Sequence, residues 1–255
     1  MELRVEGTSK AAGAIVAEMI ADAIRVNSEV NLSLPTGSTP EEALAELVRL
    51  HHSEGLDFSG ANFFNMDEYV GLAKTHEQSY YHFLNERLYS RVNIRPAATF
   101  APDAVADDLA SAASAYTDLV YGKGGFDLIF LGIGRDGHIS FNMPADALRP
   151  YTHIEQLTEA TIADNARFFA NPAEVPTQAI TIGLKMILDS RKVVLLATGD
   201  SKSEVVADWL NNDQITTSLP ASFLWLHDDV TVILDEAAAA RLDRSRYPQL
   251  SQASN

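Results

Sequence analysis

The sequence predicts an α/β protein of the doubly wound type, in which helices cover both faces of a mainly parallel sheet. Two observations support this fold class. Apolar runs with the length of strands alternate with helical patterns along the chain. In addition, residues 126–132 and 192–198 form nearly continuous apolar runs, which are typical of parallel strands covered on both faces.

The chain begins with a predicted helix, a strand and a second helix. Residues 9–26 carry apolar side chains on one helical stripe. Residues 30–34 alternate apolar and polar positions, as a strand does. We expect the next helix to begin at Pro40, because proline suits the first helical position and Glu41 and Glu42 suit the first turn.

The rest of the chain continues the same alternation. The expected elements are a strand at 61–66, helices at 79–89 and 107–121, strands at 126–132 and 192–198, a loop and helix within 199–210, and a strand at 229–236. With 255 residues, of which 46% are hydrophobic, the chain is long enough for one large core. No stretch rich in proline, glycine or serine divides it, so we expect residues 1–255 to form a single domain.

Composition excludes several classes of function. The formal net charge of −16 repels nucleic acid and anionic membranes. No apolar run reaches the ~18 residues of a membrane span, and the polar N-terminal segment lacks the apolar core of a signal peptide. The expectation is therefore a cytoplasmic protein. Cysteine is absent and the histidines lack metal-ligand spacing such as H-E-x-x-H, so we expect neither a metal nor another cofactor.

Polar residues follow the expected strands where ligands bind in this fold class. In doubly wound sheets, ligands lie beyond the carboxyl ends of the strands. The residues just after those ends are Thr36, Gly37, Ser38, Thr39, Asp67, Glu68, Asp136, His138, Ser201 and Lys202. Although these segments are far apart in the sequence, we expect them to converge on one edge of the sheet.

The loop of residues 36–39 has the features of a phosphate site. It precedes an expected helix, where free backbone N–H groups and the helix dipole favour an anion. Lys202, in a similar strand–loop–helix setting, adds a positive charge. The alternative is that Ser38 or Thr39 only caps the helix. The segment is not a P-loop, because G-x-x-x-x-G-K-[ST] is absent.

Residues 132–137, GIGRDG, match the dinucleotide pattern G-x-G-x-x-G after a strand. Glu155 lies near the spacing of a ribose-binding acid, so a dinucleotide site is a rival interpretation. Pro144 and Pro150 argue against it, because they leave little room for the long crossover helix that the motif needs.

Two groups of residues have the types that acid–base catalysis requires. Asp136 and His138 face one cavity if the chain turns at Gly137, and a nearby carboxylate orients a histidine for proton transfer near neutral pH. Asp67 or Glu68, at a strand end, offers a base for taking a proton from carbon. For Asp136 and His138 the alternative is an aspartate in a turn next to an exposed histidine. For Asp67 and Glu68 the alternative is a helix cap or a solvated turn.

Six segments together resemble the glucosamine-6-phosphate deaminase (isomerase) family, which is related to the 6-phosphogluconolactonases and shares their fold. In the family's order they are LPTGSTP (34–40), FFNMDEYVGL (63–72), SYYHFL (79–84), LGIGRDGHISFN (131–142), DNARFF (164–169) and AITIGL (179–184). The combination of NMDEYVGL with DGHISFN is more specific than any single motif above.

The resemblance implies an aldose–ketose isomerisation coupled to loss of ammonia, without a cofactor. Asp67 would take the C2 proton and return it at C1, and His138, oriented by Asp136, would open the sugar ring. The residues implied in binding the sugar phosphate are Thr36, Gly37, Ser38, Thr39, Arg167 and Lys202, with Gly132 and Gly134 letting the backbone approach the sugar. The resemblance leaves the sugar epimer open, and also whether the chain forms a homo-oligomer.

One position departs from the family pattern. After DGHISFN the family usually has a glutamate, which would share the ring-opening work, but this chain has Met143. Methionine exchanges no useful proton. One consequence is that the ring opens more slowly or that the substrate is one whose ring opens more readily. Another is that a different carboxylate, such as Asp146, replaces the glutamate. A third is that the chain has become a sugar-phosphate binder or acts on a different amino-sugar phosphate. The alternatives to the deaminase are therefore a 6-phosphogluconolactonase-like hydrolase and a non-catalytic sugar-phosphate binder.

A second difference concerns regulation. Regulated members of the family place basic residues shortly after this loop to bind an allosteric sugar phosphate. This chain has His153 and Glu155 in the corresponding stretch. We therefore expect hyperbolic kinetics without activation by N-acetylglucosamine 6-phosphate.

Overall fold

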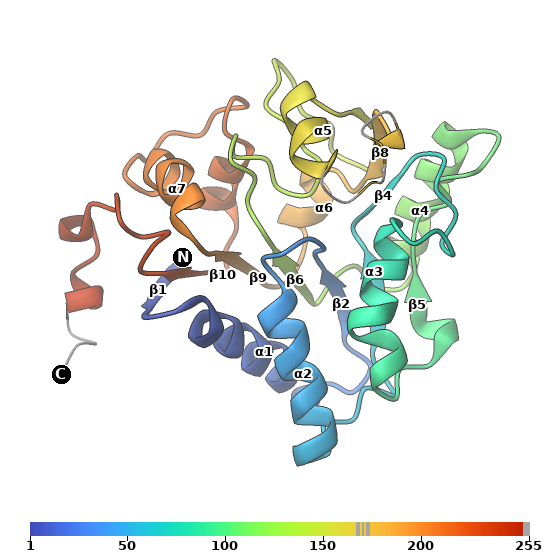
Figure 1. Ribbon diagram of the computed structural model, residues 1–255, viewed down its shortest axis with the longest axis horizontal. Coiled ribbons are helices and arrows are strands. Elements are labelled where there is room, and N and C mark those ends of the chain that lie inside the picture. Colours follow the sequence, from blue (N-terminus) through green and yellow to red (C-terminus); the bar gives the residue numbers. More distant parts are fainter. Residues whose placement is uncertain (167–168, 170, 172–173, 252–255) are drawn as a thin grey trace.

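The computed structural model describes residues 1–166, 169, 171 and 174–251. A parallel sheet runs through the middle of the molecule, as the sequence predicts (Figure 1). Its strands, in spatial order, are β1 (Glu2–Glu6), β10 (Val230–Asp235), β9 (Val193–Ala197), β6 (Leu128–Leu131), β2 (Asn31–Leu34), β3 (Asn62–Asn65) and β5 (Thr99–Phe100). Every neighbouring pair in this sheet is parallel.

Helices cover both faces of the sheet, and each face has its own hydrophobic core (Figure 1). One core lies under α1 (Ser9–Val26), α2 (Glu41–Glu54) and α3 (Tyr80–Arg87), and the other lies under α4 (Leu109–Gly122), α6 (Leu184–Leu188) and α7 (Ser203–Leu210). Strand β6 supplies both cores, with Leu128 and Phe130 on one face and Ile129 and Leu131 on the other. This alternation explains why the run is continuously apolar.

A second, antiparallel sheet stands beside the carboxyl ends of the first. Its strands are β4 (Asp67–Tyr69), β8 (Gln178–Thr181) and β7 (His153–Gln156), in that spatial order. Only Met66 separates β3 from β4, so the chain leaves the central sheet and joins the second one within a single residue. The sequence prediction missed this sheet, because strands of three or four residues are too short to show a clear period.

The predicted elements agree with the structure in order and type, with small differences at their ends. Helix α1 spans residues 9–26 as expected, whereas α2 begins at Glu41 and Pro40 is its N-cap residue. The other elements that the prediction missed are β1, β5, α6 and α5 (Glu159–Asn165). No helix follows residues 132–137 before β7, so the crossover helix of a dinucleotide motif is absent from this described stretch.

The order of the strands determines where a ligand fits. From β2 the chain continues to β3 on one side, whereas β6, the other neighbour of β2, leads to β9 on the opposite side. The loops after β2 and β6 therefore diverge and leave a crevice between them, which is where ligands bind in open α/β sheets. No helix within the described residues is long and apolar enough to cross a membrane.

Candidate active site

A cavity of about 670 Å³ lies at the carboxyl ends of the central strands. Nine of the residues singled out from the sequence line it: Thr36, Gly37, Ser38, Thr39, Asp67, Gly132, Gly134, His138 and Lys202. They come from the ends of β2, β3, β6 and β9, so these nine residues converge on one sheet edge as expected. Glu68, Asp136 and Ser201, which the sequence also singled out, are not among the residues that line the cavity. Arg167, the remaining residue implied in phosphate binding, lies outside the described residues.

The loop between β2 and α2 forms one end of the cavity. Gly37 has a φ of 90°, a left-handed conformation that glycine adopts without strain. The N-cap residue of α2 is Pro40, which makes no side-chain capping bond, so the alternative in which Ser38 or Thr39 is the cap residue is wrong. Their hydroxyls line the cavity at the N-terminal end of α2, where an anion is favoured.

Lys202 brings a positive charge to the same cavity. It ends the 3₁₀ turn Asp200–Lys202 between β9 and α7, and its Nζ donates a hydrogen bond of 2.7 Å to the Ile133 carbonyl in the loop after β6. The ammonium group is thereby held against the backbone of the GIGRDG segment. A cation in this position offsets the repulsion that a net charge of −16 exerts on an anionic ligand.

Asp67 is the buried acid of the cavity. It is 7% exposed, and burial raises the pKa of its carboxyl to about 7. The Ser140 hydroxyl donates a hydrogen bond of 2.8 Å to Asp67 Oδ2, which lowers the pKa and so limits the rise. A carboxyl with a pKa near neutrality is suited to take and return a proton at physiological pH.

Glu68, the adjacent acid, lies outside the cavity. Its carboxylate accepts hydrogen bonds from the backbone N–H groups of Tyr69, Tyr80 and Tyr81. Two of these donors belong to the first turn of α3, so Glu68 caps that helix and is absent from the cavity wall. Burial raises the pKa of Glu68, while these three bonds oppose the rise. The helix-cap interpretation is therefore correct for Glu68.

Asp136 and His138 form a pair across a tight turn. Asp136 Oδ1 lies 2.6 Å from His138 Nδ1 and also accepts from the His138 backbone N–H. Burial alone would raise the pKa of Asp136, but its bonds to His138 keep that pKa below the usual value. An ionised carboxylate only accepts hydrogen bonds, so Nδ1 carries the hydrogen and Nε2 is the nitrogen left for a ligand.

The glycines of the GIGRDG segment make this turn possible. Gly137 has a φ of 86°, which places Asp136 and His138 on the same side of the chain. At Gly134 a Cβ atom would collide with the His138 imidazole and the Asp136 carboxylate. A Cβ atom built on Gly132 would meet nothing within 4 Å, so the backbone of this residue is accessible from the cavity.

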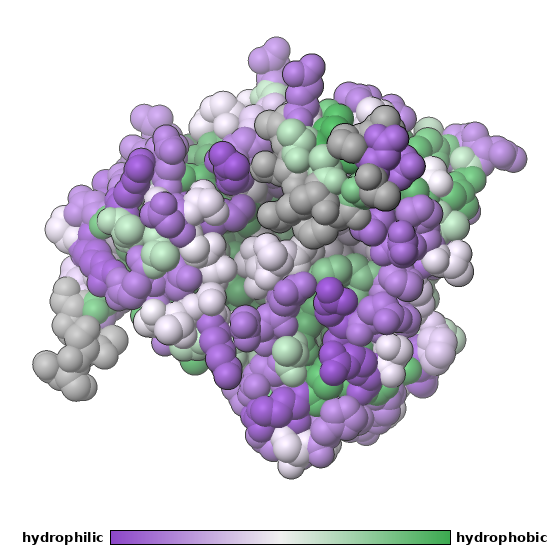
Figure 2. Space-filling view, viewed as in Figure 1, coloured by the Kyte–Doolittle hydropathy of each residue, from purple (hydrophilic) through white to green (hydrophobic). Residues whose placement is uncertain are grey.

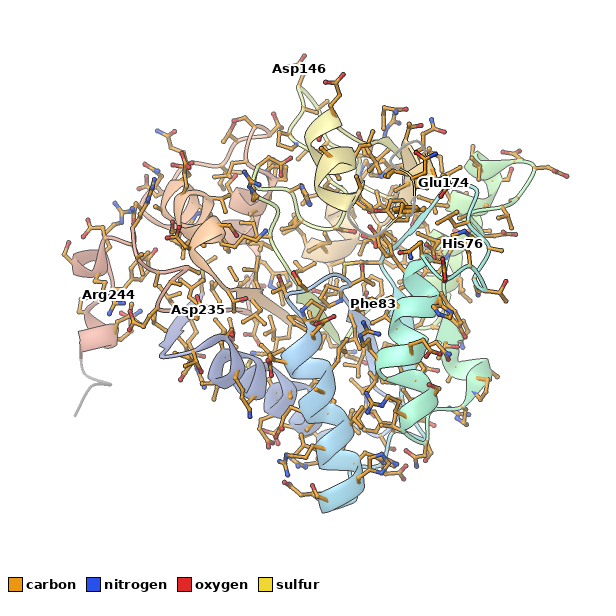
Figure 3. All side chains as sticks on the ribbon, in the orientation of Figure 1. His76, Phe83, Asp146, Glu174, Asp235 and Arg244 are labelled. Carbon is orange, nitrogen blue, oxygen red and sulfur yellow. The ribbon has the colours of Figure 1, made fainter. Side chains whose placement is uncertain are left out.

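Met143 does not line the cavity. It is 3% exposed and packs in an apolar cluster with Tyr69, Phe141, Leu157 and Ala179. Asp146, which the sequence offered as a substitute acid, is exposed and lies at the outer edge of the molecule beyond α5 (Figure 3).

Sequence reasoning missed the aromatic wall beside Asp67. Tyr69, Tyr80, Phe141 and Phe169 all line the cavity. Their rings pack together, with centroids 4.6 Å apart for Tyr69 and Tyr80 and 5.9 Å for Tyr80 and Phe141. Burial raises the pKa of the Tyr69 and Tyr80 phenols and the charge of Asp67 contributes to that rise, so this wall lies near the carboxylate. The sequence placed these aromatic residues beside the motifs but carried no signal that they would meet.

The remainder of the molecule offers no competing metal centre within the described residues, because no three His, Asp or Glu side chains gather there at coordinating distance. Hydrophilic side chains cover most of the face shown in Figure 2. The second cavity, of about 560 Å³, lies between α4 and α6 and contains none of the residues that the sequence singled out.

Comparison with known proteins identifies the family of this chain. Residues 5–233 match the family described as glucosamine-6-phosphate isomerases/6-phosphogluconolactonase. The chain is 42% identical to a glucosamine-6-phosphate deaminase of Clostridium perfringens (strain 13 / Type A) over 228 residues, which cover 89% of this chain and 94% of the relative. It is 43% identical to a glucosamine-6-phosphate deaminase of Arthrobacter sp. (strain FB24) over 247 residues, which cover 97% and 95% of the two chains.

Solved structures show the same relationship. A monomeric glucosamine-6-phosphate deaminase superimposes with a TM-score of 0.92 at 38% identity, covering 94% of this chain and all of the other. The 6-phosphogluconolactonase of Trypanosoma brucei has a TM-score of 0.74 at 22% identity, covering 94% of this chain and 98% of the other, and shares the fold. From the family match, the extent of the sequence identity and the fold, this chain belongs to the family of glucosamine-6-phosphate isomerases and 6-phosphogluconolactonases.

Proposed function

We propose that this protein converts glucosamine 6-phosphate and water to fructose 6-phosphate and ammonium, acting as an isomerase and a hydrolytic deaminase in the cytoplasm. One observation carries the proposal. Asp67, with its pKa raised to about 7, shares a single cavity with His138 and with the loop of residues 36–39. A base for carbon, an acid–base for oxygen and an anion site are the three groups that this reaction needs.

The phosphate end of the substrate sets the position of the sugar. Backbone N–H groups of residues 36–39, the hydroxyls of that loop and Lys202 offer donors and positive charge for a phosphate dianion. In the proposal Arg167 adds a further cation. Holding the phosphate places the sugar relative to Asp67 and His138, so that binding energy from this remote group orients C1 and C2.

His138 opens the pyranose ring in the first step. Its Nε2 takes the proton of the C1 hydroxyl and gives it to the ring oxygen as the C1–O5 bond breaks, while Asp136 stabilises the positive charge that the imidazole carries in between. The product is the open-chain aldehyde, in which the C2 proton is acidic because it lies next to the carbonyl. Ring opening in this proposal rests on the Asp136–His138 pair, without help from position 143.

Asp67 moves the proton from C2 to C1 in the second step. The ionised carboxylate takes the C2 proton, the protonated amino group of the substrate gives a proton to the C1 oxygen, and the protonated carboxyl then returns the first proton to C1. The product carries a protonated imine at C2. Water then adds to that carbon, the C–N bond breaks, and ammonia leaves as ammonium, which gives the ketose phosphate. Proton transfer in both directions favours a pKa near the working pH.

Ammonium release from glucosamine 6-phosphate tests the proposal, with galactosamine 6-phosphate as the epimeric control. We expect turnover of the first substrate by the wild type, and a loss of at least ~10³-fold in kcat for Asp67→Asn, which keeps the shape but removes the base. Binding of the sugar phosphate to the variant, measured by calorimetry, checks that its site is intact. Comparable kcat for Asp67→Asn and wild type would refute the role of Asp67.

The alternatives are distinct outcomes of the same experiment. Hydrolysis of 6-phosphogluconolactone without ammonium release would identify a lactonase, which needs His138 but no base for C2. Tight binding of glucosamine 6-phosphate without turnover of either amino sugar would identify a non-catalytic binder. Either result would overturn the deaminase proposal.

A further inference from the structure

Asp67 lies at one end of a chain of hydrogen bonds that runs through Ser140 and Thr181. Strands β4 and β8 are antiparallel, and Thr181 is the residue directly opposite Asp67 in their register. Ser140, from the loop after β6, lies between them, with its Oγ 2.8 Å from Asp67 Oδ2 and 2.8 Å from Thr181 Oγ1. The backbone N–H of Phe141 completes this chain of hydrogen bonds, 3.1 Å from Thr181 Oγ1.

The groups at the two ends of this chain of hydrogen bonds determine which hydroxyl donates to which acceptor. The Phe141 amide can only donate, and the ionised carboxylate of Asp67 can only accept. The Ser140 hydroxyl therefore gives its hydrogen to Asp67 Oδ2, and the Thr181 hydroxyl gives its hydrogen to Ser140. Each hydroxyl is polarised toward the carboxylate, which strengthens the bond to Oδ2.

The positive φ of Ser140 indicates that a side-chain hydroxyl is needed at this position. Ser140 has a φ of 52° and is the one residue other than glycine with a positive φ in the described part of the chain. A side chain in this region costs about 1 kcal/mol, and such strain persists where the surrounding structure imposes it. The Ile139–Asn142 bridge and the bond from Phe141 to Thr181 impose it here. Glycine would relieve the strain but would lose the group that reaches Asp67.

We propose that Ser140, oriented by Thr181, is the positioning residue for Asp67, holding Oδ2 so that Oδ1 is the oxygen that exchanges the proton with the substrate. The proposal rests on the proposed role of Asp67 as the base. A carboxylate that is free to rotate would offer either oxygen in many orientations. Tying Oδ2 to Ser140 fixes the plane of the group and directs one lone pair of Oδ1 into the cavity.

The proposal has a consequence for the pH dependence. The ionised form of Asp67 gains the bond from Ser140, so removing the hydroxyl raises the pKa of Asp67 further above its usual value. Because the base acts when ionised, the acid side of the pH profile then moves to higher pH. The titratable groups around Asp67 are Glu68, Tyr69, Tyr80 and Tyr116. Those that share its cavity also include Glu41, Glu77, His82, Glu86, Arg87, Arg135, His138 and Lys202.

These neighbours do not obscure the test. Burial raises the pKa of Tyr69 to about 12, and it raises the pKa of Tyr80 and of Tyr116 well above the usual value, so the three phenols stay neutral through the measured range. The remaining groups are present in wild type and variant alike. A difference between the two profiles therefore reports on the hydrogen bond.

Ser140→Ala is the principal variant, because alanine keeps the Cβ atom and the backbone strain and removes only the hydroxyl. We expect the acid limb of log kcat/KM to move up by about one pH unit, the size typical of one hydrogen bond to a charged group. Activity falls at least ~10-fold at pH 6 and less at pH 9. Ser140→Gly, which also relieves the backbone, gives the same shift if the alanine variant fails to fold.

Thr181 provides a matched pair of controls. Thr181→Ser keeps the hydroxyl and retains the wild-type profile. Thr181→Val has the same shape without the hydroxyl, and shifts the acid limb in the direction of Ser140→Ala by a smaller amount, because it acts through Ser140. A loss that is uniform across pH in Ser140→Ala and Thr181→Val would assign a purely structural role and overturn the proposal.

A titration that does not depend on turnover separates this proposal from the proposed function. The Asp67 carboxyl carbon is followed by NMR in protein labelled with [¹³C]aspartate and assigned with Asp67→Asn. An upward pKa shift in Ser140→Ala together with a wild type that releases no ammonium would refute the deaminase and leave the Ser140–Asp67 link standing. Unchanged Asp67 pKa and acid limb in Ser140→Ala, with active wild type, would refute the role of Ser140 alone.

Discussion

Two adjacent carboxylates show how strongly the surroundings decide the chemistry of a side chain. Asp67 and Glu68 are both buried, at 7% and 1% exposure. Three backbone N–H groups satisfy Glu68, whereas one hydroxyl donates to Asp67 among the residues that the structure describes. The acid with more donors stabilises a helix, and the acid with fewer keeps a lone pair for a substrate.

The raised pKa of Asp67 predicts a pH-dependent gain in stability for Asp67→Asn. The folded protein holds this proton up to about pH 7, whereas the unfolded chain releases it near pH 4. The contribution of Asp67 to wild-type stability therefore falls between pH 4 and pH 7 by up to about 1.4 kcal/mol per pH unit, and asparagine removes that loss. Urea unfolding should show little difference between variant and wild type at pH 4 and a more stable variant at pH 8.

A matched control for this measurement is Asp146→Asn, at an exposed aspartate. Its stability difference from wild type should stay within about 0.5 kcal/mol at both pH values. A stability difference for Asp67→Asn that is the same at pH 4 and pH 8 would contradict the raised pKa.

The Met143 side chain also illustrates the residue scale. From the sequence, this position marked a missing acid. In the structure the thioether fills an apolar cluster behind the aromatic wall, where the Thr161 hydroxyl lies 3.9 Å from its sulfur. Its contribution in this arrangement is packing, which suits a flexible apolar side chain.

At the scale of elements, the short strand β4 and helix α3 depend on each other. The first N–H groups of a helix lack partners within it. Two of those in α3 donate to Glu68 in β4, and the Ser79 hydroxyl accepts a third from His82. Because α3 supplies Tyr80, Phe83 and other residues of the cavity wall, the cap also positions that wall (Figure 3).

We expect Glu68→Ala to reduce the free energy of unfolding by about 3 kcal/mol, because it leaves buried N–H donors without acceptors. Glu68→Gln should fall between wild type and alanine, since its single oxygen replaces part of the carboxylate. Urea denaturation measures both. The control is Glu159→Ala, at an exposed acid in the first turn of α5, which should cost less than about 1 kcal/mol. Equal losses at the two positions would contradict the capping role.

At the scale of the whole molecule, the fold brings three cations into one cavity of an acidic protein. Arg87, Arg135 and Lys202 line the cavity together with the acids Glu41, Asp67, Glu77 and Glu86, and Arg87 pairs with Glu41 at 3.5 Å. Charges on the surface are screened beyond about 10 Å at ordinary ionic strength. An anionic ligand in the cavity therefore depends on the cations nearest to it, such as Lys202, and the overall net charge of −16 favours solubility.

The stretch that regulated relatives use for an allosteric anion predicts the form of the kinetics. In this chain His153 Nε2 lies 3.2 Å from Glu155 Oε2 within β7, so an acid is paired with the histidine of this stretch and disfavours a second anion beside it. We expect initial rates to follow a hyperbola in glucosamine 6-phosphate, with a Hill coefficient of about 1 and no activation by N-acetylglucosamine 6-phosphate. A sigmoidal curve that this compound relieves would contradict the expectation.

Much of this arrangement could be predicted from the sequence. The apolar runs at 126–132 and 192–198 determined the parallel sheet, because strands covered on both faces have no polar side. Once the strands were placed, the rule that ligands bind at their carboxyl ends located residues 36–39, Asp67, His138 and Lys202. These inferences succeed because they depend on local patterns and on a general property of the fold class.

The sequence by itself determined the fold class, the edge of the sheet where the cavity lies and nine of the residues that line it. Only the tertiary structure decided that Asp67 rather than Glu68 faces the cavity, that Met143 turns into the core, and that Ser140 and Thr181 meet behind the carboxylate. The physical reason is that burial and hydrogen-bond donors determine what an acid can do. The residues that bury Asp67 and donate to it come from β8 and from the loop after β6. No local pattern in the sequence shows that these segments lie next to Asp67.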